Sequence, residues 1–232
     1  MSLEAVILDV DGTLVDSERD GHRVAFNAAF TEFGLAWRWE VEEYGRLLAV
    51  TGGRARLHAY LAEQGVPEEE RADLVPRLHR RKTELFLDLV AEGAVPPRPG
   101  VVGFLDDVSG AGMRLAVATT GSLAWVKPLL ERHFGLHRFE VVVGGDDVKE
   151  TKPDPGAYLV VLDRLRLEPG SAVAVEDSVP GLGAARAAGV TCVVVTNDYT
   201  RGQDFAGAAA VLDGFSELDV STLRSLSGAA PA

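Results

Sequence analysis

Two aspartates that lie two residues apart follow the first apolar segment of the chain. The segment 5–8 is short and rich in β-branched residues, and Asp9, Asp11 and Gly12 come directly after it. In an extended chain, side chains two residues apart point the same way, so both carboxylates can face one site. Two neighbouring acids are costly unless a cation lies between them or one of them holds a proton. A plain turn capped by Asp is the alternative that these residues alone leave open.

Three later apolar segments also end in polar residues. Thr119 and Thr120 follow one of them, where a hydroxyl and a backbone N–H can hold a phosphoryl oxygen. Lys152 follows the next and supplies a point charge. Glu176 and Asp177 follow the third and add carboxylates of the kind that Mg²⁺ binds. Taken singly, Thr119 can be explained as the N-cap of a helix, and Lys152 can be explained as an exposed surface residue. Together with the aspartate pair, these residues provide the chemical groups that the formation of an aspartyl phosphate needs.

The elements that must position these residues alternate along the chain. Apolar segments without polar alternation are typical of strands covered on both faces, and they lie at 5–8, 115–118, 141–143, 172–175 and 192–195. Helical segments stand between them at 124–133, 155–165 and 181–188. The alternation predicts an α/β fold with a doubly wound, mostly parallel sheet of Rossmann-like type. In such a sheet, chemistry lies beyond the carboxyl ends of the strands.

The region 17–91 interrupts this alternation. It contains no continuous buried-strand segment and is typical of helices, which we expect at 23–33, 41–48, 54–63 and 71–90. The proline-rich segment 94–100 follows, and no helix continues through it. We therefore predict a small all-helical cap domain at 17–91, inserted into a catalytic core made of 1–16 and 92–232.

Composition and charge narrow the class of protein. The net charge of -12 and the lack of a basic stripe argue against a nucleic-acid partner. No segment approaches the ~20 apolar residues that a membrane helix needs. The N-terminus lacks a basic region, and Cys192 is the one cysteine, so no internal disulfide forms. We expect a cytoplasmic monomer that binds a small phosphorylated molecule. Local cations must then reverse the negative field at the phosphate site.

The motif set resembles that of the haloacid dehalogenase superfamily. The matching positions occur in family order and are Asp9-x-Asp11-Gly12-Thr13, Thr119, Lys152-Pro153-Asp154-Pro155 and Glu176-Asp177-Ser178 with Gly181. The resemblance implies that Asp9 attacks phosphorus and forms an aspartyl phosphate, while Asp11 acts as general acid and then as general base. It also implies that Thr119 and Lys152 stabilise charge on the transferred group.

The same resemblance implies a magnesium site and places the substrate residues. Mg²⁺ would be held by the carboxylates of Asp9 and Asp177 and the backbone carbonyl of Asp11, with Glu176 ordering a metal-bound water. Thr120 stands where many relatives carry Asn, and its hydroxyl can still hydrogen-bond to the substrate.

We expect the residues that select the leaving group to lie in the helical region 17–91. Gly52 and Gly53 lead into a predicted helix that begins with Arg54, which is a ready anion site, although a plain helix-start turn fits these residues too. A phosphate bound there, in addition to the one that is hydrolysed, would make the substrate a bisphosphate.

Further patches resemble the CbbY-like branch of the superfamily, whose members remove xylulose 1,5-bisphosphate. They are Asp20-Gly21-His22-Arg23, Tyr44-Gly45, Leu47-Leu48, Gly52-Gly53, Arg56, Lys82-Thr83-Glu84-Leu85-Phe86 and Arg98-Pro99-Gly100-Val101. The resemblance implies substrate contacts from Glu18, His22, Arg54 and Lys82. Arg54 replaces the usual Lys, so a forked donor stands in place of a point charge.

The predicted function is a Mg²⁺-dependent phosphatase acting on a small sugar phosphate, with xylulose 1,5-bisphosphate as the first candidate. A β-phosphoglucomutase-like isomerase shares the motifs and returns the phosphoryl group to the sugar instead of to water. A receiver-type signalling module also phosphorylates an Asp beside Thr, Lys and Mg²⁺, but it is shorter and needs no inserted region of ~75 residues.

Overall fold

A computed structural model describes residues 3–50 and 52–226 of the chain. The chain divides into two compact units, one formed by 1–16 with 96–232 and the other by 17–95. The role of the second unit as a cap stays a prediction.

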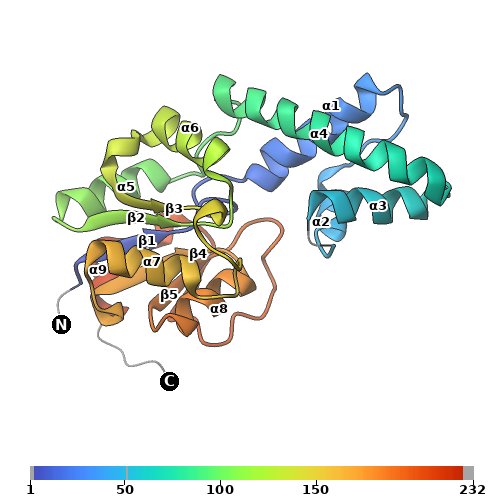
Figure 1. Cartoon of the computed structure of the whole chain (residues 1–232). Coiled ribbons are helices and arrows are strands. Elements are labelled where there is room, and N and C mark those ends of the chain that lie inside the picture. The colour runs from blue at the N-terminus through green and yellow to red at the C-terminus, as the bar shows by residue number, and fades with distance from the viewer. Residues whose placement is uncertain (1–2, 51, 227–232) are drawn as a thin grey trace. The chain divides into compact units, whose positions relative to one another are not determined.

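The first unit is built on a parallel sheet (Figure 1). Within the described residues the sheet has six strands, in the order β3-β2-β1-β4-β5-β6, and every pair of neighbours is parallel. The strands are β1 Ala5–Leu8, β2 Arg114–Ala118, β3 Phe139–Val143, β4 Ala172–Glu176, β5 Thr191–Val195 and β6 Ala210–Leu212. The predicted doubly wound α/β fold is therefore confirmed. The strand β1 lies between β2 and β4, so Leu8 is in register with both Val117 and Val175.

Helices cover the sheet because its strands are apolar on both faces. Alternate residues of β1 to β5, such as Ile7 and Ala174, pack in one buried cluster with α7 (Gly156–Leu165) and α8 (Val179–Ala187). On the other side of the sheet, α5 (Val101–Gly110) packs on β2 and against α9 (Val220–Leu226). The helix α6 (Leu123–Phe134) connects β2 to β3. Single-turn 3₁₀ segments lie at Leu136–Arg138, Gly145–Asp147, Pro169–Ser171 and Phe215–Glu217.

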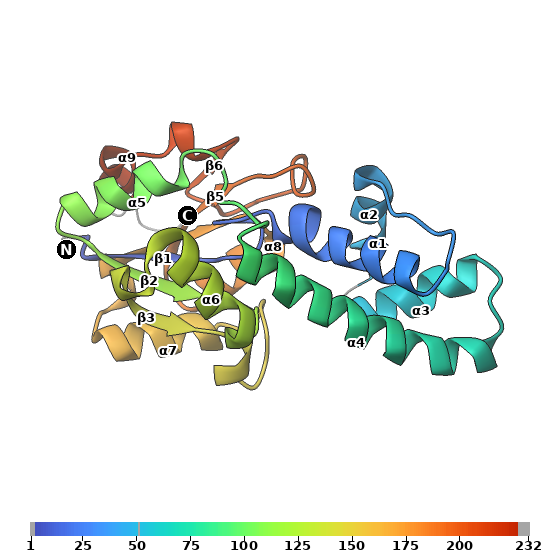
Figure 2. The same cartoon turned by 90° about the horizontal axis from the view of Figure 1, so that it is seen from above.

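The second unit is helical. It contains a π-helical turn η1 (Ser17–His22), α1 (Arg23–Glu32), α2 (Val41–Leu47), α3 (Gly53–Glu63) and α4 (Glu68–Glu92). The helices α1 and α3 both pack on the long α4 (Figure 2). An aromatic core holds the unit together, with Trp39 at its centre and its ring 4.7 Å from that of Phe26 and 5.1 Å from that of Tyr60.

Some expectations about elements need correction. The helix expected at 71–90 begins at Glu68, because acidic residues in a first turn interact favourably with the helix dipole. The strand β6, the helices α5 and α9 and the π-helical turn were not predicted. The strand β6 has three residues, none of them buried, so it carries little of the apolar pattern that marks a strand. No described helix combines the length and apolar character needed to cross a bilayer.

Candidate active site

The carboxyl ends of neighbouring strands bring acidic residues together in the first unit. Asp9 follows β1 directly, and Glu176 is the last residue of β4, which pairs with β1. Asp177 comes next in the chain, and Asp9, Glu176 and Asp177 are all buried. Each of the three offers a carboxylate oxygen, and these oxygens lie within 4.8 Å of one another. The strand order therefore places Asp9 beside Glu176 and Asp177, which come from a distant part of the chain.

Lys152 lies among these acids. Its Nζ is 2.6 Å from Oδ1 of Asp9 and 2.6 Å from Oε1 of Glu176, and its side chain is 5% exposed. Burial by itself would lower the pKa of Lys152, but the carboxylates of Asp9 and Glu176 outweigh it and raise that pKa above its usual value. Lys152 is thus a permanent cation beside Asp9, and the surface-charge alternative is wrong.

Tyr158 of α7 completes the surroundings of Glu176. Its hydroxyl donates to Oε1 of Glu176 at 2.5 Å, so that oxygen accepts two hydrogen bonds. Burial raises the pKa of Glu176 to about 7, while Lys152 opposes this shift. The other oxygen, Oε2, is buried and has no hydrogen-bond partner among the described residues. It lies so close to Gly181 that a Cβ at that position would come within 1.9 Å of it.

The turn after β1 is tight and depends on Gly12. The backbone N–H of Gly12 donates to the carbonyl of Val15 at 2.7 Å, and Gly12 has a φ of +87°. A Cβ at this position would also lie 2.3 Å from Oδ2 of Asp177. Only glycine satisfies both requirements. Thr13 follows and donates from its hydroxyl to Oδ1 of Asp177 at 3.2 Å.

The donor set fits a hard cation such as Mg²⁺. Carboxylate oxygens are the ligands that this ion prefers, and Asp9, Glu176 and Asp177 provide them in one place. Burial raises the pKa of Asp177 well above its usual value, and the nearby carboxylates of Asp9, Glu176 and Asp11 add to the shift. Such crowding of acids is relieved by a bound cation, and Oε2 of Glu176 is a buried oxygen without a hydrogen-bond partner among the described residues.

The remaining predicted residues of the core differ in their surroundings. Asp11 is half-buried in the turn, and its charge contributes to the raised pKa of Asp177. Thr119 is fully buried, and its hydroxyl accepts a hydrogen bond from the N–H of Gly121 at 3.1 Å. It does not cap a helix, because α6 starts at Leu123 with Ser122 as its N-cap. Thr120 is exposed.

In the second unit, the structure brings two predicted substrate residues into contact. Lys82 is buried in α4, and its Nζ lies 2.9 Å from Nδ1 of His22 and 4.8 Å from the ring centre of Phe26. Burial lowers the pKa of His22 well below its usual value, and the charges of Lys82 and Arg56 lower it further. His22 is therefore neutral, and several cations are close to it.

Glu18 belongs to a second cluster in this unit. Its Oε2 accepts a hydrogen bond from the Tyr44 hydroxyl at 2.5 Å and lies 3.5 Å from NH1 of the buried Arg56. Gly52 and Arg54 are exposed at the start of α3, and Gly52 takes a φ of +88° there. Burial lowers the pKa of His79, and the charges of Lys82 and Arg54 lower it further. The start of α3 and this part of α4 thus form one positive region within the unit.

Three residues that were not predicted as site residues contact the candidate site: Tyr158, Asn197 and Arg98. Asn197 donates to Asp177, and Arg98 donates to the turn after β1. A signal existed for Asn197, because it follows the apolar segment that forms β5 just as the other site residues follow theirs. Arg98 was named only as part of a family-like patch. Nothing in the sequence marks Tyr158, whose role follows from the packing of α7.

Comparison with known proteins agrees with these features. Residues 3–189 match the family model of haloacid dehalogenase-like hydrolases. The chain belongs to this family. It is 44% identical to the protein CbbY of Cereibacter sphaeroides over 93% of this chain and 94% of that protein. It is also 41% identical to a CBBY-like protein of Arabidopsis thaliana, over 90% of this chain and 68% of that one.

A solved structure of a relative matches most of the chain. A mutant of CbbY from Rhodobacter sphaeroides, crystallised in complex with xylulose-(1,5)bisphosphate, matches with a TM-score of 0.80 and 43% identity. The match covers 95% of this chain and 99% of the CbbY chain. The predicted resemblance to the haloacid dehalogenase superfamily and its CbbY-like branch is confirmed, as is the prediction of a hydrolase of this family.

Proposed function

We propose that this protein is a Mg²⁺-dependent phosphatase that hydrolyses a sugar bisphosphate through an aspartyl phosphate on Asp9, with xylulose 1,5-bisphosphate as its substrate. The observation that carries the proposal is the position of Lys152, 2.6 Å from Asp9 and from Glu176, beside the carboxylate of Asp177. A buried nucleophilic carboxylate, a fixed cation and a site for a hard metal ion are the groups that phosphoryl transfer needs.

In the first half of the reaction, a carboxylate oxygen of Asp9 attacks phosphorus, and the bond from phosphorus to the sugar oxygen breaks. Asp11 gives a proton to the departing sugar oxygen. Lys152 neutralises charge on Asp9 before attack and on the phosphoryl oxygens as they approach. The hydroxyl of Thr119 lies at the end of the adjacent β2, where it can hold one of those oxygens.

In the second half, water attacks the phosphorus of the aspartyl phosphate, and Asp11 accepts the proton of that water. The bond from phosphorus to Asp9 breaks, which releases inorganic phosphate and restores the carboxylate. Mg²⁺, held by Asp9, Asp177 and the Asp11 backbone carbonyl, would neutralise phosphoryl charge. Glu176 would order a metal-bound water.

The second unit supports a bisphosphate as substrate. Lys82 and Arg56 lie close enough to lower the pKa of His22, and Lys82 and Arg54 lower the pKa of His79. A concentration of cations within one small unit favours an anionic ligand. We propose that the phosphate that is not hydrolysed binds to Lys82, Arg54 and the N–H groups at Gly52 and Gly53, while Glu18 and His22 contact sugar hydroxyls. The crystal structure of the CbbY mutant with xylulose-(1,5)bisphosphate supports this substrate.

The test is a phosphate-release screen over pentose and hexose phosphates with Mg²⁺, in which xylulose 1,5-bisphosphate and ribulose 1,5-bisphosphate are compared directly. We expect kcat/KM to be highest for xylulose 1,5-bisphosphate. Equal turnover of both bisphosphates would contradict the proposed substrate. Interconversion of glucose phosphates without release of phosphate would instead identify a mutase. Light scattering on a sizing column tests the prediction of a monomer, and cell fractionation tests the prediction of a cytoplasmic location.

A further inference from the structure

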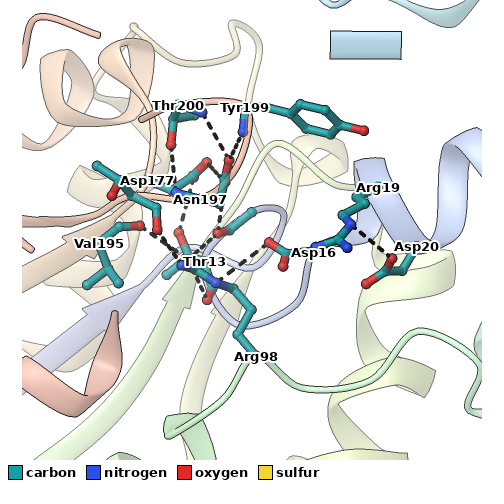
Figure 3. A network of polar contacts seen from close by, with 12 residues as sticks. Thr13, Asp16, Arg19, Asp20, Arg98, Asp177, Val195, Asn197, Tyr199 and Thr200 are labelled. Atoms are coloured by element: carbon teal, nitrogen blue, oxygen red, sulfur yellow. Dashed lines mark hydrogen bonds and ion pairs between the residues drawn. The ribbon is translucent and has the colours of Figure 1, made fainter. Parts of the chain in front are cut away.

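Asn197 follows the carboxyl end of β5 and contacts the candidate active site. It lies two residues after β5, and its side chain is 8% exposed (Figure 3). Its Nδ2 donates two hydrogen bonds, one to Oδ2 of Asp177 at 2.8 Å and one to the carbonyl of Gly12 at 3.2 Å. One amide group thus contacts a candidate metal ligand and the turn that follows the candidate nucleophile.

The orientation of this amide is fixed by its other end. Oδ1 of Asn197 accepts hydrogen bonds from the backbone N–H groups of Tyr199 at 2.8 Å and Thr200 at 3.1 Å. Backbone N–H groups only donate, so the oxygen must face them and the NH₂ group must face Asp177. All four hydrogen-bonding positions of the side chain are then used, which leaves it no other low-energy rotation.

Arg98 links two backbone segments beside Asn197. It is buried, and NH1 donates to the Gly12 carbonyl at 2.6 Å and to the Val195 carbonyl at 3.2 Å (Figure 3). NH2 donates to the Thr196 carbonyl at 2.5 Å. The guanidinium therefore ties the turn after β1 to the segment that carries Asn197. Arg98 and Asn197 both donate to the Gly12 carbonyl, so the backbone next to Asn197 is joined to the turn that carries Gly12.

From these contacts we infer that Asn197 is a positioning residue for Asp177 and that it sets the affinity of the site for Mg²⁺. This inference depends on the proposed function. Asp177 accepts hydrogen bonds on both oxygens, from Thr13 and from Asn197, which orient the carboxylate and stabilise its charged form. Hydrogen-bond partners of metal ligands contribute about 10- to 100-fold to metal affinity.

The main variant is Asn197→Ser. A serine hydroxyl can still accept a hydrogen bond from a backbone N–H two or three residues later, so the loop keeps its anchor. It is too short to reach Asp177. The matched control is Thr196→Val, which removes hydrogen bonds from the neighbouring residue to Leu212 and Asp213 and leaves Asp177 untouched. Asn197→Ala is a second variant that also removes the anchor.

The dissociation constant of Mg²⁺ is measured by calorimetry without substrate, together with the melting temperature and the Mg²⁺ dependence of phosphate release. We expect Asn197→Ser and Asn197→Ala to weaken Mg²⁺ binding about 10- to 100-fold, with activity restored by excess Mg²⁺. Thr196→Val should lower the melting temperature and keep the wild-type Mg²⁺ affinity. A folded Asn197→Ser variant with wild-type Mg²⁺ affinity would overturn the inference and leave the proposed function standing. A wild-type protein that neither binds Mg²⁺ nor releases phosphate would overturn both.

Discussion

The ammonium group of Lys152 lies 2.6 Å from Oδ1 of Asp9, although the two residues are 143 positions apart in the chain. Both side chains are almost completely buried, so water screens their interaction little. The same ammonium group contacts Glu176, which is fully buried. Lys152 therefore compensates the charge of two buried acids and also adjoins the candidate nucleophile.

Replacing this cation should reduce both stability and catalysis. In Lys152→Met the side chain keeps its approximate length, but Asp9 and Glu176 lose their counter-charge. Removal of one partner from a buried ion pair costs about 3–5 kcal/mol, and loss of a charge that stabilises the transition state costs on the order of 10²- to 10³-fold in kcat. Urea unfolding without Mg²⁺ and steady-state kinetics measure the two effects. A variant with native stability and native kcat would show that Lys152 has neither role.

The assignment of Asp9 as nucleophile predicts the behaviour of Asp9→Asn. The amide has the same shape as the carboxylate but does not form an acyl phosphate, so turnover should fall by on the order of 10⁴-fold or more. Circular dichroism should show an unchanged fold. Metal-dependent hydrolysis that persists in this variant would assign the nucleophile to another residue.

Two neighbouring glycines of α8 should respond differently to alanine. A Cβ at Gly181 would lie 1.9 Å from Oε2 of Glu176, so Gly181→Ala must displace that carboxylate. We expect a loss of about 1–3 kcal/mol in the free energy of unfolding and a fall in kcat.

The control for this prediction is Gly183→Ala. At Gly183 the nearest atom to the added methyl group would be Cβ of Pro153 at 3.4 Å, an ordinary contact. Alanine in a helix interior should then stabilise the protein by up to about 1 kcal/mol. Urea unfolding compares the pair, and equal effects at both positions would contradict the close approach of Glu176 to Gly181.

Metal binding should stabilise the folded protein. At a Mg²⁺ concentration 100 times its dissociation constant, binding adds about 2.7 kcal/mol, which raises the melting temperature of a chain of this size by roughly 5–10 °C. Chelation by EDTA should reverse the shift and abolish phosphate release. Asp177→Asn serves as control and should show no shift. An equal shift in this variant would place the bound Mg²⁺ elsewhere.

Lys82 in α4 tests the role of the second unit. Lys82→Met should raise KM for xylulose 1,5-bisphosphate by roughly 10- to 150-fold, because a hydrogen bond to a charged group contributes about 1.5–3 kcal/mol. KM for a sugar monophosphate should stay unchanged. Arg80→Met removes an exposed cation two residues away on the same helix and should leave both KM values at the wild-type level. A parallel rise for both substrates in Lys82→Met would contradict binding of a second phosphate.

The sequence determined the strands and the residue types at their ends. The segment at 5–8 is a strand with the predicted bounds, and Asp9, Thr119 and Glu176 stand at the carboxyl ends of strands as expected. This was possible because a strand buried on both faces is mostly a continuous apolar run, so that polar residues are concentrated near its ends. The same pattern could not reveal β6, which is short and not buried.

Only the tertiary structure decided which of these residues meet. The order of the strands places β1 between β2 and β4, and this order is not encoded in any local pattern. The contacts of Asp9 with Lys152, of Glu176 with Tyr158 and of Asp177 with Asn197 depend on it. Tyr158 is otherwise a core residue of α7, so its hydroxyl has a specific partner only because α7 packs against the sheet. Local sequence supplies chemical groups, and long-range packing selects their partners.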